Sequence, residues 1–155
     1  MVGFVCIHVW GFDRSNEKAL HYAEACGLAF QLTNILRDVK EDAARDRIYL
    51  PREDMIRFGV SEADLKQSAM SSALKLLILF EADRAERYYN QAEQLMPLLD
   101  PTGRPTYRIM LQIYHGILET IFRQRGEVYK SHARVSTPRK LSIVASAWIS
   151  SRLGR

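Results

Sequence analysis

The sequence predicts an all-α fold, an antiparallel bundle of long helices that forms a single domain over residues 1–155. Apolar side chains recur every three to four residues in three long stretches, at 17–46, 68–95 and 105–125. No stretch alternates apolar and polar residues as a half-buried strand would. Glycine and proline separate these stretches, which is typical of connections between packed helices.

The composition is that of a globular protein that is not integral to a membrane. Apolar residues make up 47% of the chain and charged residues 26%. The apolar stretch 1–12 is too short to span a bilayer, and it lacks the basic start and cleavage site of a signal peptide. Cys6 and Cys26 lie in apolar helical contexts, which indicates reduced core thiols and a cytoplasmic location.

The charge balance excludes one class of function and fits another. With 22 basic and 18 acidic residues the net charge is +4, and the basic residues form no long stripe, so we expect no nucleic-acid partner. A weak positive balance suits an anionic diphosphate or an anionic lipid surface. The four histidines show no zinc-ligand spacing; they are His8, His21, His115 and His132.

The first long helix is expected to begin at about Glu17, with Ser15 as its N-cap. Gly27 would allow a neighbouring helix to approach closely, or the helix to bend. Pro51 biases the residues before it toward an extended exit from this helix. A short helix at 52–58 should then end at Gly59.

Ser61 and Asp64 resemble a capping box and predict one more helical turn. We expect these short elements to cover the first helix and exclude water from it; the alternative is a plain surface connection. Pro97 to Gly103 predicts a turn. The helix at 105–125 is apolar on more than one face, so it should be central and buried. Basic residues precede a final amphipathic helix over 141–149, which either rests on a membrane surface or packs on the core.

Oxygen-bearing side chains follow one another at single-turn spacing in the first long helix. Asn34, Asp38 and Asp42 are four residues apart, which places adjacent side chains roughly 5 to 6 Å from each other. The two carboxylates repel unless a cation lies between them, and Mg²⁺ prefers such oxygen ligands together with phosphate oxygens. Carboxylates four apart are also common on solvated helix faces, and spacing alone leaves both interpretations open.

The segment from Gln31 to Pro51, QLTNILRDVKEDAARDRIYLP, resembles the second aspartate-rich motif of squalene and phytoene synthases. These enzymes of isoprenoid biosynthesis, including the carotenoid and hopanoid branches, join two prenyl diphosphates head to head (1'-1). The likeness continues over Glu81 to Tyr89 and Tyr107 to Leu141. It implies that the fold is part of an isoprenoid synthase bundle.

The resemblance also implies roles for single residues. Asn34, Asp38 and Asp42 would bind Mg²⁺ and, through it, a prenyl diphosphate. Further substrate contacts and catalytic neighbours are implied at Gln31, Arg37, Arg45, Tyr49, Tyr114 and Arg134. No glycine-rich dinucleotide loop is visible, so NADPH as a second cofactor is left open. The substrate length, C15 or C20, is left open as well, and so is the final product.

Two departures from the family pattern limit these implications. Family members carry a first aspartate-rich motif on an earlier helix, whereas residues 1–12 resemble the middle of a family member. We therefore expect the chain to correspond to the C-terminal half, to have little synthase activity alone, and to self-associate through exposed apolar faces. The alternative is a non-catalytic helical interaction module with a remnant site. Asp46 extends the acidic line by one turn and is expected to be solvated.

Overall fold

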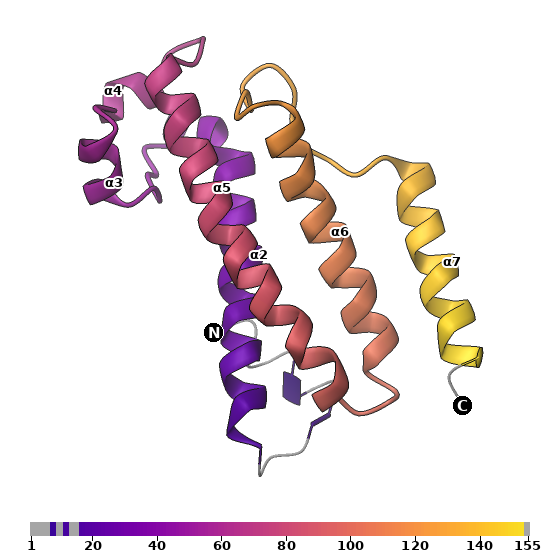
Figure 1. Ribbon diagram of the computed structural model, residues 1–155. Coiled ribbons are helices and arrows are strands. Elements are labelled where there is room, and N and C mark those ends of the chain that lie inside the picture. The colour runs from indigo at the N-terminus through magenta and orange to yellow at the C-terminus, as the bar shows by residue number, and fades with distance from the viewer. Residues whose placement is uncertain (1–6, 9–10, 13–15, 154–155) are drawn as a thin grey trace.

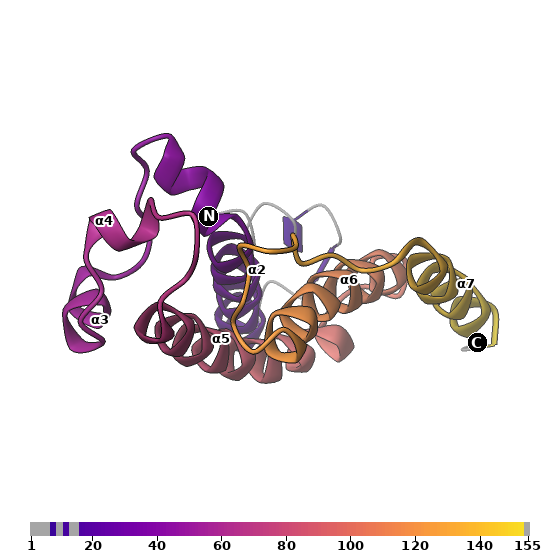
Figure 2. The same cartoon turned by 90° about the horizontal axis from the view of Figure 1, so that it is seen from above.

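The computed structural model describes residues 7–8, 11–12 and 16–153, with the side chains of 151–153 left out. Three long helices lie side by side and form the body of the molecule (Figure 1). Two short helices lie at one edge and the last helix at the other, as the view from above shows (Figure 2). The helices are α2 (Glu17–Ala44), α3 (Arg52–Arg57), α4 (Glu62–Leu65), α5 (Ser72–Ala92), the 3-10 helix η1 (Glu93–Leu98), α6 (Arg104–Arg123) and α7 (Thr137–Leu153).

The predicted all-α class is confirmed, because the described residues contain no strand beyond an isolated bridge between Phe12 and Leu99. None of the described helices is long and apolar enough to cross a membrane. Cys26 is a buried thiol, as predicted, whereas Cys6 lies outside the described residues.

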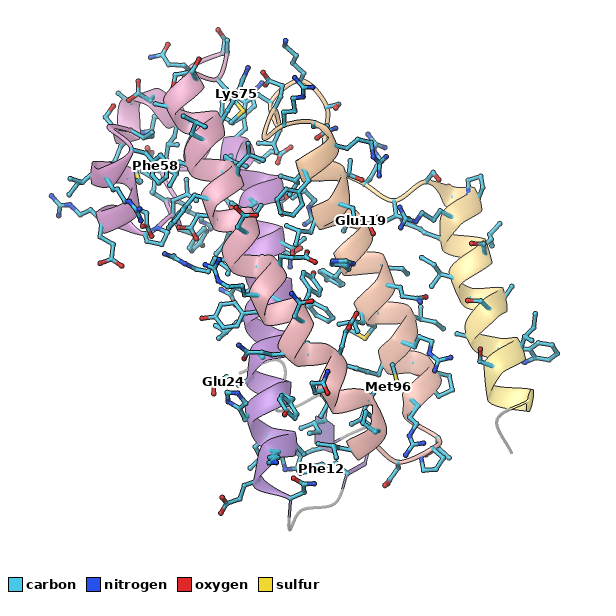
Figure 3. The ribbon with its side chains drawn as sticks, viewed as in Figure 1. Phe12, Glu24, Phe58, Lys75, Met96 and Glu119 are labelled. Atoms are coloured by element: carbon cyan, nitrogen blue, oxygen red, sulfur yellow. The ribbon has the colours of Figure 1, made fainter. Side chains whose placement is uncertain are left out.

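The core lies between α2, α5 and α6. The most extensive contact joins α2 to α5. Many of the side chains that α2 buries are alanines, which let the helices approach closely, while α5 buries Leu77 and Ile78 completely. The hydroxyls of Thr33 and Tyr89 lie 2.9 Å apart and tie these two helices together inside the core. Side chains from all three helices fill the space between them (Figure 3).

Helix α6 is central, as its apolar pattern predicts. It contacts α2, α5, η1 and α7, and its exposed residues are only Thr106, Gln112 and Arg123. Tyr107 is fully buried and donates a 2.5 Å hydrogen bond to the carbonyl of Ala92, where α5 ends. Burial raises the pKa of Tyr107, so the phenol stays a neutral donor.

The helix ends differ from the predicted ones at three places. The N-cap of α2 is Asn16, whose side chain accepts from the amide of Lys18; Ser15 lies outside the described residues. Helix α5 begins four residues later than predicted, because the Ser71 hydroxyl caps it by accepting from the amide of Leu74. Its α-helical part ends at Ala92 and tightens into η1, so Pro97 lies in a 3-10 helix and not in the predicted turn.

The remaining elements agree closely with prediction. Helix α2 ends at Ala44, and α6 ends at Arg123, before Gly126 with φ 74°. Gly59, with φ 65°, follows α3, and Ser61 forms the capping box with Asp64 at the start of α4. The last helix extends further than 141–149 on both sides.

A buried ionic network fixes α3 to α5. Arg84 donates to both carboxylate oxygens of Glu81 at 3.0 Å and to Asp54 at 2.9 Å. The Glu81 side chain is 0% exposed and that of Asp54 7%. Burial raises the pKa of Glu81 to about 7, with Asp54 adding to the rise and Arg84 opposing it. Two buried carboxyl groups thus share the guanidinium of Arg84, whose side chain is partly exposed.

We expect this network to make folding pH-dependent. Between pH 4.5 and 7, Glu81 stays protonated in the folded chain and ionises in the unfolded chain, so stability falls by up to about 3 kcal/mol as pH rises. Glu81→Gln replaces the protonated acid by a neutral amide and should remove this slope. Urea unfolding at pH 5, 6, 7 and 8 measures it. Glu53→Gln, on the exposed side of α3, is the control and should keep the slope. If the free energy of unfolding of Glu81→Gln fell with pH as steeply as that of the wild type, Glu81 would not be the group that causes the pH dependence.

Candidate metal and diphosphate site

One face of α2 carries a concave pocket of about 290 Å³. Five of its lining residues come from α2 and the sixth from the segment that follows it. The neighbouring face of α2, with Thr33, Leu36 and Val39, is buried in the core and holds the helix in place. The pocket is lined by Gln31, Asn34, Ile35, Asp38, Asp42 and Tyr49.

The chain after α2 supplies one wall of this pocket. Residues 47–50 turn back beside Ile35, Val39 and Asp42, and Leu65 packs in the same place. Leu50 and Leu65 are buried there, which directs Tyr49 to the pocket side of the segment. Helix α4 thus comes near the site through Leu65, but no residue of α3 or α4 lines the pocket itself. Gln31 and Tyr49 are exposed, so the pocket opens to solvent and the predicted cover is incomplete.

The side chain of Asn34 contains a buried hydrogen-bond acceptor that is not satisfied. Its side-chain oxygen Oδ1 is buried and has no hydrogen-bond partner in the described part of the chain. A buried acceptor without a partner costs roughly 1 to 3 kcal/mol. The same pocket holds the partly buried carboxylates of Asp38 and Asp42. One neutral carbonyl oxygen and two carboxylates form a donor set that suits a hard divalent cation such as Mg²⁺.

Asp38 is already held by cationic or protonatable groups. Arg37 donates from Nε to Oδ1 at 2.7 Å and from Nη2 to Oδ2 at 2.6 Å. His132 places Nε2 3.5 Å from Asp38 Oδ1 and Nδ1 3.4 Å from Glu41 Oε1. The hydrogen bond to Asp38 raises the pKa of Arg37, and the nearby Tyr114 and Glu41 add to the rise. A permanent positive charge therefore lies beside the acidic line.

The other predicted residues lie around the pocket or away from it. Tyr114 stacks on Phe30 with ring centroids 4.3 Å apart and helps to raise the pKa of Arg37. Tyr114 does not line the pocket. Arg45, the C-cap of α2, and Arg134 are exposed and also outside the lining. Asp46 is exposed and pairs with Lys66 at 2.6 Å, which agrees with its predicted solvation.

Two residues near the site escaped the sequence analysis. Ile35 is an apolar residue next to Asn34 in the sequence, and its side chain forms part of the pocket wall. His132 reaches Asp38 and Glu41 from the segment before α7. No local spacing could reveal this contact, because it depends on how α6 returns the chain to α2.

Comparison with known proteins adds an independent observation. Residues 1–140 match the family model described as "Squalene/phytoene synthase". The 15-cis-phytoene synthase of Synechocystis sp. is 39% identical over 96% of this chain. A crystal structure of a dehydrosqualene synthase in complex with a ligand superposes with a TM-score of 0.73 at 34% identity, over 84% of this chain and 46% of that one.

A second solved structure, squalene synthase HpnC from Alicyclobacillus acidocaldarius, has a TM-score of 0.68 at 26% identity, over 72% of this chain and 43% of that chain. The chain spans about half the length of the curated relatives it matches: 47% of the Synechocystis protein and 49% of the 15-cis-phytoene synthase of Synechococcus elongatus, which is 37% identical over 90% of this chain.

Proposed function

The chain belongs to the squalene/phytoene synthase family, and from this premise we propose that the pocket on α2 binds Mg²⁺ together with a prenyl diphosphate. The proposed reaction is the head-to-head condensation of two prenyl diphosphates, to which this chain contributes one diphosphate site. The observation that carries the proposal is the pocket itself, which Asn34, Asp38 and Asp42 line together, with the buried side-chain oxygen of Asn34 left without a hydrogen-bond partner in the described part of the chain.

In this proposal Asn34, Asp38 and Asp42 hold the cation and orient the diphosphate. The bound Mg²⁺ supplies Lewis-acid stabilisation of the diphosphate as a leaving group. Arg37 does not line the pocket but donates to Asp38, which does, and it is proposed to contact a diphosphate oxygen from there. Gln31 and Tyr49 supply hydrogen-bonding groups at the open side of the pocket. More distant contacts are proposed for Arg45, Tyr114 and Arg134.

The hydrocarbon part of the substrate is proposed to run along α2 away from Asp38. Leu28 lies on the same side of α2 as Ile35, two turns toward the N-terminus, and is 40% exposed. An apolar surface next to the diphosphate site would keep water from a developing carbocation, which water would otherwise convert to an alcohol. Leu32 and Ile113 are proposed as further parts of this surface.

A thermal-shift experiment tests the proposed site on the chain itself. Farnesyl or geranylgeranyl diphosphate should raise the melting temperature in the presence of Mg²⁺, and EDTA should abolish the rise, because ligand and metal bind the folded state together. The alternative function is a non-catalytic helical interaction module with a remnant site. That alternative predicts no Mg²⁺-dependent rise with either prenyl diphosphate.

Turnover is proposed to require more than these 155 residues. The acidic line of α2 engages one diphosphate, whereas the condensation must position two. We expect the chain, incubated with Mg²⁺ and labelled farnesyl or geranylgeranyl diphosphate, to give little or no 1'-1 product, and to self-associate in sedimentation experiments. Robust formation of the product by the chain alone would contradict the proposal that turnover requires more than these 155 residues.

A further inference from the structure

The segment 124–136, which joins α6 to α7, is anchored against α2 and α4. The Tyr129 hydroxyl donates a 2.6 Å hydrogen bond to the last carbonyl of α4, and Lys40 of α2 lies over the Tyr129 ring, 5.3 Å from its centroid. Ala133 is fully buried. Figure 2 shows the segment passing beside α2 on its way from α6 to α7. The backbone is thus held on both sides of His132, so the fold sets the place of this side chain.

The imidazole of His132 lies between two carboxylates of α2. Its Nε2 is 3.5 Å from Asp38 Oδ1, and its Nδ1 is 3.4 Å from Glu41 Oε1. Both distances are longer than an ordinary N–H···O hydrogen bond, so the ring acts on the carboxylates as a neighbouring polar group that limits their movement. Asp38 lines the pocket, whereas His132 and Glu41 do not. His132 therefore lies beside a proposed metal ligand without entering the pocket itself.

The carboxylate of Asp38 is restrained by two different segments of the chain. Arg37 donates to both of its oxygens, but Arg37 is the preceding residue of the same helix and has a long side chain with many rotamers. His132 approaches Oδ1 from the anchored segment before α7. The two contacts together limit the rotation of the Asp38 side chain. A ligand that is already held in one orientation loses less conformational entropy when a cation binds.

We propose that His132 is a positioning residue for the cation site. It keeps the carboxylate of Asp38 turned toward the pocket, and Glu41 keeps the imidazole in place. The inference rests on the Mg²⁺ site of the proposed function and adds the residue that orders one of its ligands. A role as a direct ligand suits His132 less well, because Mg²⁺ prefers oxygen ligands and His132 does not line the pocket.

Electron paramagnetic resonance of Mn²⁺ bound to the 155-residue chain, with inorganic diphosphate present, tests this role. His132→Ala should weaken Mn²⁺ binding about tenfold, the lower end of the loss seen when a partner of a metal ligand is removed. His132→Gln should bind Mn²⁺ within about threefold of the wild type, because the amide nitrogen of glutamine can still donate toward Asp38. Pulsed experiments should show no nitrogen bound directly to Mn²⁺.

A double-mutant cycle tests the part assigned to Glu41. Glu41→Gln should weaken Mn²⁺ binding about threefold in the wild type and cause no further loss in His132→Ala, because Glu41 acts through the imidazole. Equal losses from Glu41→Gln in both backgrounds would overturn the part assigned to Glu41.

His21→Ala is the matched control, since His21 is an exposed histidine near the start of α2. It should bind Mn²⁺ as the wild type does, and circular dichroism should show the same helix content for all variants. The positioning role is overturned if the wild type and His132→Ala bind Mn²⁺ equally well, or if His132→Gln loses as much as His132→Ala. A nitrogen bound directly to Mn²⁺ would also overturn it, because His132 would then be a ligand. If the wild type itself does not bind Mn²⁺, the proposed function fails and the positioning role fails with it.

Discussion

Asp42→Asn should weaken Mg²⁺-dependent binding of prenyl diphosphate to the chain at least about 100-fold. Loss of partners that only support a metal ligand typically costs 10- to 100-fold in affinity, so loss of a charged ligand should cost at least as much. Asp38→Asn should act similarly, with the added effect that it replaces one of the two oxygens that accept hydrogen bonds from Arg37 by an amide group that cannot accept. Calorimetric titration of the diphosphate at saturating Mg²⁺ measures the loss.

Asp46→Asn is the control for this pair. Asp46 follows Asp42 by four residues in the sequence, but it lies beyond the end of α2 and outside the pocket, and its partner is Lys66. Its backbone has φ 56°, a conformation that asparagine tolerates well, so the variant should fold normally. It should bind the diphosphate as the wild type does. If Asp46→Asn weakened binding as much as Asp42→Asn, binding would follow the overall acidity of α2 and not the geometry of the pocket.

Arg84→Met should be the most destabilising of the single changes considered, at about 3 kcal/mol at pH 7. The variant leaves Asp54 and Glu81 buried without their guanidinium partner, and an uncompensated buried charge costs several kcal/mol. Urea unfolding followed by circular dichroism gives the free energy of unfolding. Because Glu81 is neutral at low pH, the loss should be smaller at pH 5 than at pH 8.

Arg87→Met controls for the loss of an arginine from α5. Arg87 is exposed one turn after Arg84, so its replacement should change the free energy of unfolding by no more than about 0.5 kcal/mol. A similarly small change in the free energy of unfolding for Arg84→Met would show that the ionic network contributes little to holding α3 against α5.

Helical periodicity was sufficient to predict the fold class, because the apolar side chains of α2, α5 and α6 that recur at helical spacing are those that form the core. The N-terminal ends of the helices were less predictable where several neighbouring residues could act as the N-cap. Ser15, Asn16, Ser68 and Ser71 are all good caps by type, and the choice among them depends on how the helices pack. Pro97 was assigned to a turn from its residue type, yet a 3-10 helix accommodates it.

The acidic line could be predicted because its residues are close in sequence. Asn34, Asp38 and Asp42 share a helix face by spacing alone, and the structure places all three in one pocket with Gln31 and Tyr49. The surroundings of that line come from distant segments. His132 reaches Asp38 only after the chain has passed through α5 and α6, and the partnerless state of the Asn34 oxygen is visible only in three dimensions.

Titration of the chain with Mn²⁺, followed by electron paramagnetic resonance, tests most directly whether one cation joins the acidic line to a diphosphate. Linkage requires that each ligand strengthen the binding of the other by the same factor. We predict that inorganic diphosphate lowers the dissociation constant of Mn²⁺ from the chain at least about tenfold. The Asp38→Asn/Asp42→Asn variant should lose this effect. The signal that remains with the variant gives the background from Mn²⁺–diphosphate complexes free in solution. Equal Mn²⁺ affinity with and without diphosphate, or an unchanged response in the variant, would contradict the proposed site.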